Sequence, residues 1–500
     1  MRDAYEELTD HFKKIGDLRH VHAISSWDEA AMMPVGGGSS RGEALASLGV
    51  VIHEMLTSKE IGEWLDSCSN LDLDEWQRAN LREIDREYLE NICLSADFVR
   101  ASSVAGSNAE QAWRIHRAGN DWQAMAPHLD EVIGFAREEA AVRAGATGLG
   151  LYDAMLDTYE PGMRVEALDQ LFGDLKAELP GMIEGAIDIQ SHTPMLPLGD
   201  IFPIERQRNL GLQIMVALGF DFEHGRLDVS HHPFCGGVQE DVRITTRYTE
   251  KNFIESLMAV VHETGHAMYE QGRPRAMPGQ PVTRARSAGV HESQSLMMEM
   301  QIGRSTAFLE FITPMVQAAF DAEPDDAAWS RQNLKRLYTN VERSLIRVDA
   351  DELTYPLHVI LRYEIEKDLI EGKAEARDIP AMWDEKMLAY LDLDTRGNYQ
   401  DGCLQDVHWP AQLFGYFPTY TLGAMMAAQF FNAMSRSLPD LAEEIRTGRL
   451  ERAVGWLRQN VHGKGSLLVT NDLMASATGE PLNARYFLNH LKARYLVDVA

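Results

Sequence analysis

Residues 252–272, NFIESLMAVVHETGHAMYEQG, carry the pattern that decides the fold of this chain. Apolar side chains recur here at the three- and four-residue spacing of a helix, which brings to one face Phe253, Leu257, Val260, Val261 and Met268. Gly272 and, soon after it, Pro274 supply a stop signal. Gly265 costs an isolated helix about 1 kcal/mol relative to alanine, which tertiary packing can absorb. The stretch therefore predicts one amphipathic helix.

This helix contains an H-E-x-x-H motif. Side chains four residues apart lie one above the other on a helix, so His262 and His266 can present imidazole nitrogens to one ion. Glu263 lies about 100° round the helix, where its carboxylate can reach a water on that ion without binding the ion itself. The competing interpretation is a helix whose two histidines have only a structural role.

A third ligand is needed, because a catalytic zinc site normally has three protein ligands and one open position. Glu292 begins a second apolar-periodic segment 26 residues after His266. Glu270 lies one turn from His266, but a single helix cannot easily close three sides of a tetrahedron. We therefore expect Glu292 to be the third ligand, held by the polar side chains of residues 293–295.

The composition excludes several classes of protein. Lys and Arg total 47 against 76 Asp and Glu, and the resulting net charge of -29 repels nucleic acid and anionic membrane surfaces. No run of 18 apolar residues occurs, and the charged first residues do not resemble a signal peptide. We therefore expect a cytoplasmic protein without nucleic-acid or membrane partners. The four cysteines are isolated, so a metal must use imidazole and carboxylate ligands.

Helical periodicity dominates the chain, and the predicted fold class is mainly α. Alternating β-branched residues between 225 and 248 predict a small sheet just ahead of the metal-binding helix. The Gly/Ser-rich stretch 33–42 is interpreted as a mobile lid or a connection rather than a domain boundary. No repeat or low-complexity linker interrupts the chain, so residues 1–500 are expected to form one helical domain, in which two lobes could flank a groove.

The motifs HETGH and HESQS stand in a longer series. HPF (232–234) and DVRIT (241–245) precede them, while IRVDAD (346–351) and GCLQDVHW (402–409) follow. Six motifs in this order resemble the carboxypeptidase Taq family of metallocarboxypeptidases. SWDEAAMMP, YEPG and FGYFPTYTLG extend the likeness over most of the chain.

The resemblance implies that His262, His266 and Glu292 bind one divalent metal per chain, zinc in the first place and cobalt as the alternative, with Glu263 as catalytic base. It also implies a nearly all-helical fold with a deep central groove, similar to neurolysin and angiotensin-converting enzyme, with the small sheet beside the active site. It further implies a homodimer.

The chain departs from the family pattern on both sides of the Glu292 motif. Leu296 and Met300 stand where the family usually has Arg and Asn, and Thr283 and Arg284 stand where it tends to have Gly and an acidic residue. These positions leave the ligands intact and affect the residues around them, so they bear on metal preference.

A carboxypeptidase must recognise a free terminal carboxylate, and a buried arginine suits this because its guanidinium binds carboxylate through two parallel hydrogen bonds. We expect Arg347 in this role, with Asp349 and Asp351 as neighbours that could orient it. Arg243 is the second candidate, because an edge strand beside the groove would bind extended peptide through its main chain. Three further residues of the family motifs could donate to the developing oxyanion, namely His232, His408 and Tyr420.

The predicted function is removal of single amino acids from the C-terminus of peptides. The metal polarises the scissile carbonyl and lowers the pKa of its water toward about 7, and Glu263 moves the proton to the leaving amine. Two alternatives remain open. One is an oligopeptidase of similar architecture that cuts internal bonds of short peptides, and the other is a non-catalytic acidic helical scaffold.

Overall fold

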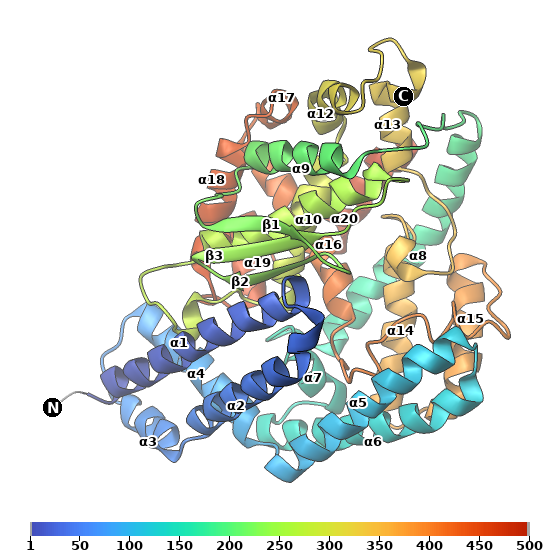
Figure 1. Ribbon diagram of the computed structural model, residues 1–500. Coiled ribbons are helices and arrows are strands. Elements are labelled where there is room, and N and C mark those ends of the chain that lie inside the picture. Colours follow the sequence, from blue (N-terminus) through green and yellow to red (C-terminus); the bar gives the residue numbers. More distant parts are fainter. Residues whose placement is uncertain (1–2, 498–500) are drawn as a thin grey trace.

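The computed structural model describes residues 3–497 and is built almost entirely of helices (Figure 1). The first half of the chain contains α1 (Ala4–Ala31), α2 (Gly38–Leu56), α3 (Lys59–Cys68), α4 (Glu75–Ile92), α5 (Ala96–Ala118), α6 (Trp122–Thr147), α7 (Leu151–Leu156), α8 (Val165–Ser191) and α9 (Ile204–Leu218). The second half contains α10 (Phe253–Gly272), α11 (Ala288–Leu296), α12 (Thr306–Ala319), α13 (Arg331–Tyr338), α14 (Tyr355–Ile370), α15 (Ile379–Leu391), α16 (Pro418–Ser437), α17 (Leu441–Arg446), α18 (Glu451–Asn460), α19 (Thr470–Thr478) and α20 (Ala484–Lys492). The π-helices η3 (Met297–Gly303) and η8 (Ala493–Val497) extend α11 and α20. The prediction of a mainly helical fold is confirmed.

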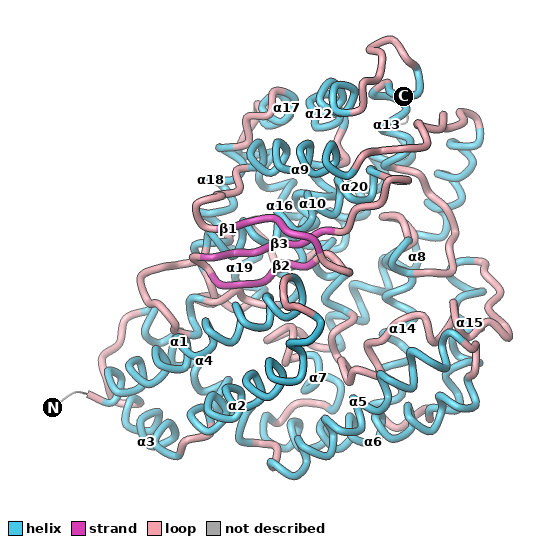
Figure 2. The backbone as a smooth tube through the Cα atoms, viewed as in Figure 1, coloured by secondary structure: helices cyan, strands magenta, loops and turns pink. Residues whose placement is uncertain are grey.

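The predicted sheet lies between α9 and α10, where Figure 2 shows its three strands. β3 (Asp241–Thr246) is central, with β1 (Gly225–Val229) parallel on one side and β2 (Phe234–Val238) antiparallel on the other. The expectation that Arg243 lies on an edge strand is therefore wrong. The segment after β1 folds back as β2 and covers the edge of β3 that would otherwise be free.

Helix α10 spans the predicted residues and begins where Asn252 accepts hydrogen bonds from the backbone N–H groups of Ile254 and Glu255. Its apolar face is buried, as predicted from the spacing of its side chains. The helix packs against α9 and β3 and against α11, and α11 in turn lies along α16. Gly265 permits this packing, because a Cβ atom there would lie 2.3 Å from the carbonyl oxygen of Gln294 on α11.

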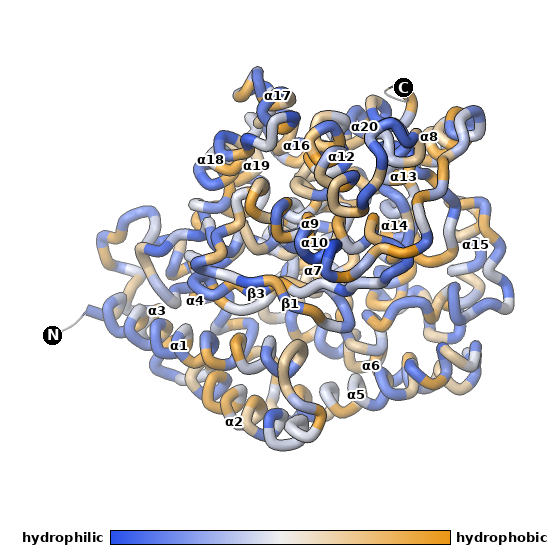
Figure 3. The backbone as a smooth tube through the Cα atoms, turned by 45° about the horizontal axis from the view of Figure 1, so that its top comes forward, coloured by the Kyte–Doolittle hydropathy of each residue, from blue (hydrophilic) through white to orange (hydrophobic). Residues whose placement is uncertain are grey.

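The helices enclose two separate large apolar clusters. The larger one extends from α5 to α20 and includes most of the apolar face of α10, whereas α1 to α4 enclose a smaller cluster of their own around Phe12 and Ile84. Figure 3 shows hydrophilic and hydrophobic stretches alternating along outer helices such as α1 and α6, as expected for helices with one face in solvent. Among residues 3–497, no helix combines the length and the apolar character needed to cross a membrane.

The stretch 33–42 connects α1 to α2, which agrees with the second of its two interpretations. Most of it is helical, because it forms a 3-10 turn, η1 (Val35–Gly37), and then the start of α2. Arg41 explains the order, because it donates a hydrogen bond of 2.8 Å to the carbonyl of Ser25 and pairs at 2.8 Å with Asp28, both on α1. The glycines of this stretch suggest a flexible backbone, whereas the contacts of Arg41 hold the stretch against α1.

Candidate metal centre

Three predicted ligands converge between α10 and α11. The Nε2 atom of His266 lies 3.4 Å from Glu292 Oε2, and the Nε2 atom of His262 lies 3.9 Å from the same oxygen. One donor atom from each of the three residues lies within 4.8 Å of the others. Ligand atoms at about 2.0–2.1 Å from a tetrahedral zinc ion are about 3.4 Å apart, so this donor set fits a divalent metal.

Hydrogen bonds at the far nitrogens turn both imidazoles toward this point. Glu299 Oε2 lies 2.9 Å from His262 Nδ1, and the backbone carbonyl of His291 lies 3.1 Å from His266 Nδ1. Each Nε2 atom is therefore left facing Glu292. Ser295 donates a hydrogen bond of 3.4 Å to Glu292 Oε2, so one of the three polar residues expected to hold Glu292 does so.

Glu299 was missed by the sequence analysis. It lies seven residues after Glu292, about two helical turns on, which was the available signal. The segment that carries it is the π-helix η3, in which the residue spacing per turn changes, so helical periodicity alone could not fix its direction.

Glu270, the rival ligand, is held away from the cluster. His291 Nε2 lies 3.0 Å from Glu270 Oε1, and Arg273 pairs with Glu270 at 2.7 Å. This arrangement lets Glu270 support His291, which in turn contacts His266.

The protonation states of the cluster differ sharply. Burial lowers the pKa of His266 to about 4, which leaves the neutral imidazole that a metal requires. Burial would raise the pKa of Glu292, but the hydrogen bond to His266 and the charge of His262 hold it at about 2. Burial would lower the pKa of His262, but the hydrogen bond to Glu299 and the charge of Glu292 raise it to about 10, so a cation there must displace a proton.

Glu263 is the carboxyl that can exchange a proton near neutral pH. Burial raises its pKa to about 7, and it is only 7% exposed. Its Oε2 atom is buried and has no hydrogen-bond partner among residues 3–497. A buried carboxylate oxygen without a partner, next to His262, suits the binding of a water beside the cluster.

A cavity of about 430 Å³ opens directly beside the cluster. Its wall includes two of the converging donors, His266 and Glu292, together with Tyr159 and Tyr416. A small molecule that entered this cavity would meet two of the three converging donors, His266 and Glu292, from one side.

Arg347 lies in the 3-10 turn η5 (Arg347–Asp349) and is 6% exposed, as expected for a buried arginine. Its partners differ from those expected, because Nε and Nη2 bind the two carboxylate oxygens of Asp406 at 3.1 and 2.9 Å. Nη1 donates to the hydroxyl of Tyr355 at 2.8 Å. Asp351 instead caps the residues after it and does not orient Arg347. Asp406 is 59 residues away in sequence, which explains why local patterns favoured the wrong acid.

Tyr420 and His408 lie together near Arg347. The hydroxyl of Tyr420 is 3.3 Å from His408 Nε2, and its ring lies under the Arg347 guanidinium at 5.1 Å. Tyr416 lies near the donors as well, because it lines the same cavity as His266 and Glu292. Burial raises the pKa of Tyr416, and the charge of Glu292 adds to this. These aromatic residues connect the Arg347 turn with the converging donors.

His232 and Arg243 are not brought to the cluster by any contact found among residues 3–497. His232 is exposed in the loop between β1 and β2. Arg243 pairs with Asp241 through two hydrogen bonds and lies over the ring of Trp27 at 4.8 Å. Both residues border the sheet rather than the three donors.

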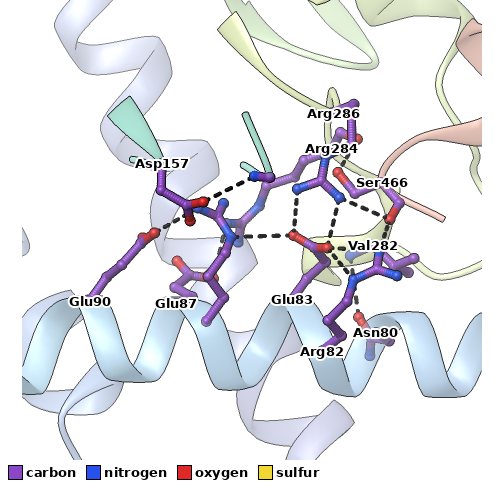
Figure 4. A network of polar contacts seen from close by, with 12 residues as sticks. Asn80, Arg82, Glu83, Glu87, Glu90, Asp157, Val282, Arg284, Arg286 and Ser466 are labelled. Atoms are coloured by element: carbon purple, nitrogen blue, oxygen red, sulfur yellow. Dashed lines mark hydrogen bonds and ion pairs between the residues drawn. The ribbon is translucent and has the colours of Figure 1, made fainter. Parts of the chain in front are cut away.

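An ion-pair network joins α4 to the segment that leads into α11 (Figure 4). Arg286 binds both carboxylate oxygens of Glu83 at 2.8 and 3.1 Å, and Arg284 pairs with Glu87 at 3.0 Å. Arg82 donates to the carbonyl of Ser466 at 2.5 Å, which adds a C-terminal segment to the network. The family departure at Arg284 thus has a structural role, because it fixes the approach to α11.

Comparison with known proteins agrees with this arrangement. The family model described as carboxypeptidase Taq (M32) metallopeptidase matches residues 7–495. Thermostable carboxypeptidase 1 of Thermus thermophilus is 37% identical over 98% of this chain and 98% of its own length. Carboxypeptidase 1 of Bacillus subtilis is 34% identical over 98% of this chain and 97% of its own length. Among solved structures, metallocarboxypeptidase 1 of Trypanosoma cruzi has a TM-score of 0.96 at 44% identity, covering 98% of this chain and 99% of that one. An M32 carboxypeptidase of Deinococcus radiodurans has a TM-score of 0.93 at 33% identity, covering 98% of each chain.

Proposed function

Because this chain belongs to the carboxypeptidase Taq (M32) family of metallopeptidases and is a metallocarboxypeptidase acting on peptides, we propose that His262, His266 and Glu292 bind its divalent metal. The observation that carries the proposal is the convergence of two imidazoles from α10 and one carboxylate from α11 within 4.8 Å. We propose one zinc ion per chain, with cobalt as the alternative, since imidazole and carboxylate ligands suit both metals.

The proposed mechanism assigns proton transfer to Glu263. A divalent metal in the site would supply Lewis-acid polarisation of the scissile carbonyl and would lower the pKa of a water. Glu263 accepts the proton of the attacking water and passes it to the leaving amine. A pKa of about 7 supports this role, because such a carboxyl both gains and loses a proton near neutral pH.

We propose that Arg347 anchors the terminal carboxylate of the peptide. Asp406 already occupies Nε and Nη2, so the substrate would meet the Nη1 side of the guanidinium together with the hydroxyl of Tyr355. Tyr420 and His408 are proposed donors to the developing oxyanion, supported by their contact with each other and with Arg347. Binding of the peptide by Arg243 and His232 stays a prediction.

The cellular and oligomeric setting is also a proposal. We propose a cytoplasmic protein, supported by four cysteines that are all free, as is usual in reducing compartments. A homodimer is proposed on the resemblance to the family. Light scattering of the purified protein would test it, and a mass of one chain at micromolar concentration would overturn it.

Replacing Glu263 by Gln tests the mechanism. E263Q should lose peptide hydrolysis by several orders of magnitude while metal content stays near one ion per chain, because Glu263 moves protons and does not bind the metal. Hydrolysis is read by mass spectrometry on peptides with free and with amidated C-termini. Near-normal release of single amino acids by E263Q would refute the assigned role.

A further inference from the structure

A second cavity, of about 440 Å³, is lined in part by η3, the segment that also packs against α10. Its wall is built from η3, the start of α12, α13, the ends of α16 and α20, and α17. None of the proposed metal ligands and none of the proposed substrate-binding residues lines it. It is therefore a separate space from the one beside His266 and Glu292.

The lining of this cavity is cationic in a strongly acidic protein. Its charged side chains include Arg304, Lys335, Arg446 and Arg494, and no aspartate or glutamate lines it. The chain as a whole carries a net charge of -29. A concave wall with one sign of charge concentrates the potential and attracts small ions of the opposite sign.

An unpartnered buried amide marks the same cavity. Gln301 is 2% exposed and lines the cavity, yet its Oε1 atom has no hydrogen-bond partner among residues 3–497. Nε of Arg304, on the same wall, is also buried without a partner. Polar atoms buried in native proteins are almost always hydrogen-bonded. The N–H at Nε of Arg304 lacks an acceptor and the amide oxygen of Gln301 lacks a donor, so these two orphans on one cavity wall call for a bound group that can both accept and donate.

The remaining wall is apolar, which limits the kind of ligand. It is formed by Ala307, Phe431, Leu438, Pro439, Leu441, Ala442 and Ile445. A bare inorganic ion would leave this surface without contacts, whereas an organic anion can bury a small apolar body against it.

We propose that this cavity binds a small phosphate monoester, whose phosphate oxygens accept from Arg304 and Arg446, whose remaining P–OH group donates to Oε1 of Gln301, and whose apolar body contacts Phe431. Arg446 reaches the cavity from α17 and is held by Glu310 and Glu443, so the carboxylates that balance it do not themselves line the cavity. Arg494 is likewise held at 2.9 Å by the buried Glu352. The cations are thus fixed in place before any ligand arrives.

The site is connected to the metal centre through one arginine. Arg304 lines the cavity and also forms an ion pair with Glu299, whose other oxygen lies 2.9 Å from His262 Nδ1. An anion that attracts Arg304 weakens the hold of Arg304 on Glu299 and alters the partner of His262. This coupling rests on the proposed role of His262, whereas the binding of the anion does not.

Binding is tested by isothermal titration of the full-length, metal-loaded protein with phenyl phosphate, benzoate and inorganic phosphate. We expect phenyl phosphate to bind at least tenfold more tightly than inorganic phosphate, which lacks the apolar body, and than benzoate, whose carboxylate has no O–H group for Gln301. Gln301→Leu and Arg446→Gln should each weaken that binding at least tenfold. The matched control is Arg331→Gln, which also loses a pair with Glu310 but does not line the cavity, and it should bind within twofold of the unaltered protein.

Two results would overturn the proposal. One is the absence of phenyl phosphate binding by the unaltered protein, with thermal unfolding showing that the protein is folded. The other is equal binding in Gln301→Leu, Arg446→Gln and Arg331→Gln, which would place the anion elsewhere, for example beside the metal.

The coupling is tested with the same probe on metal-loaded and chelator-treated protein. Linkage requires that the metal change the affinity for the anion by the same factor as the anion changes the affinity for the metal. We expect at least a threefold difference in the Kd of phenyl phosphate. Equal values would refute the coupling while leaving the binding result, and the proposed metal ligands, to be judged separately.

Discussion

Glu299 governs how one imidazole faces the metal centre. Its carboxylate holds His262 Nδ1 at 2.9 Å and is itself paired with Arg304. A carboxylate in this position fixes the tautomer and the ring orientation of a ligating histidine and increases its basicity.

Replacing Glu299 by Gln should weaken metal binding by about 10–100-fold, because the amide supports His262 less strongly than a carboxylate does. Competition with a chromophoric chelator measures the affinity. Glu310→Gln makes the same change at a surface ion pair and should leave metal affinity unaltered. Equal affinity in E299Q and the unaltered protein would show that Glu299 does not support the ligand.

At this scale the sequence predicted residues that act within one helix better than those that act between elements. The spacing of His262, Glu263 and His266 follows from helical geometry, and the structure brings Glu292 to the same point. The partner of Arg347 was assigned wrongly, because Asp406 reaches it from a segment 59 residues away. A local sequence pattern carries no information about a contact between residues 59 positions apart.

Single elements approach each other closely where glycine allows it. A Cβ atom at Gly265 would lie 2.3 Å from the carbonyl oxygen of Gln294, and one at Gly423 on α16 would lie 2.7 Å from the side chain of Glu292. The position of α11 is thus set from two sides, by the backbone of α10 at Gly265 and by the side chain of Glu292, which packs on Gly423 of α16.

Gly265→Ala should therefore push α11 away from α10 and lower both stability and metal affinity. Overpacking of this kind typically costs about 1–3 kcal/mol, even though alanine favours the helix itself. Thermal unfolding and metal titration measure the two effects. Gly134→Ala in α6 is the control, because nothing lies within 4 Å of its Cβ position, and it should be neutral or stabilising. Unchanged metal affinity in G265A would contradict the close-packing argument.

A buried acid from the segment after α7 contacts the first turn of α11. Glu160 accepts a hydrogen bond from the backbone N–H of Gly289, is fully buried, and has no hydrogen-bond partner for Oε2 among residues 3–497. Burial raises its pKa from 4.5 to about 7. The folded state therefore keeps a proton between pH 4.5 and 7 that the unfolded state has lost.

The free energy of unfolding must then fall as pH rises through this window, by about 3 kcal/mol at about 1.4 kcal/mol per pH unit. Glu160→Gln removes the penalty, so its Tm should exceed that of the unaltered protein at pH 8 and approach it near pH 4.5. Differential scanning calorimetry at several pH values measures this. Glu184→Gln, an exposed change, should show no such trend. A Tm difference for E160Q that does not vary with pH would refute the prediction.

At the scale of the whole molecule, the ion pairs in Figure 4 link the four N-terminal helices, α1–α4, to the helices that hold the metal centre. Glu83 is 5% exposed and is paired with Arg286, whose side chain is 1% exposed, and also with Arg82. Removing one partner of such a buried pair leaves an uncompensated charge.

Glu83→Gln should destabilise the protein by about 3–5 kcal/mol, since Arg286 would stay buried without its carboxylate. Hydrogen exchange should rise first in α1 to α4, as read by mass spectrometry. Glu90→Gln, which breaks a more exposed pair with Arg86, should cost less than about 1 kcal/mol. Similar hydrogen exchange of α1–α4 in E83Q and E90Q would indicate that the network does not hold these four helices in place.

The sequence predicted the helical class and the small sheet, because period and composition are local properties. The arrangement of two apolar clusters and the network between them depends on contacts such as Asn80 with Gln280, 200 residues apart, which periodicity does not encode. The prediction of one domain with two lobes stays a prediction.

The contact between Arg82 and Ser466 spans 384 residues of sequence, which has a consequence during synthesis. At about 5–20 residues per second, a ribosome needs about 20–80 s to make the second partner after the first. For that interval the first four helices exist without the segment that completes their anchorage. Nascent chains stalled before Ser466 should therefore expose this part of the protein to chaperones and proteases, and its docking should be among the last events of folding.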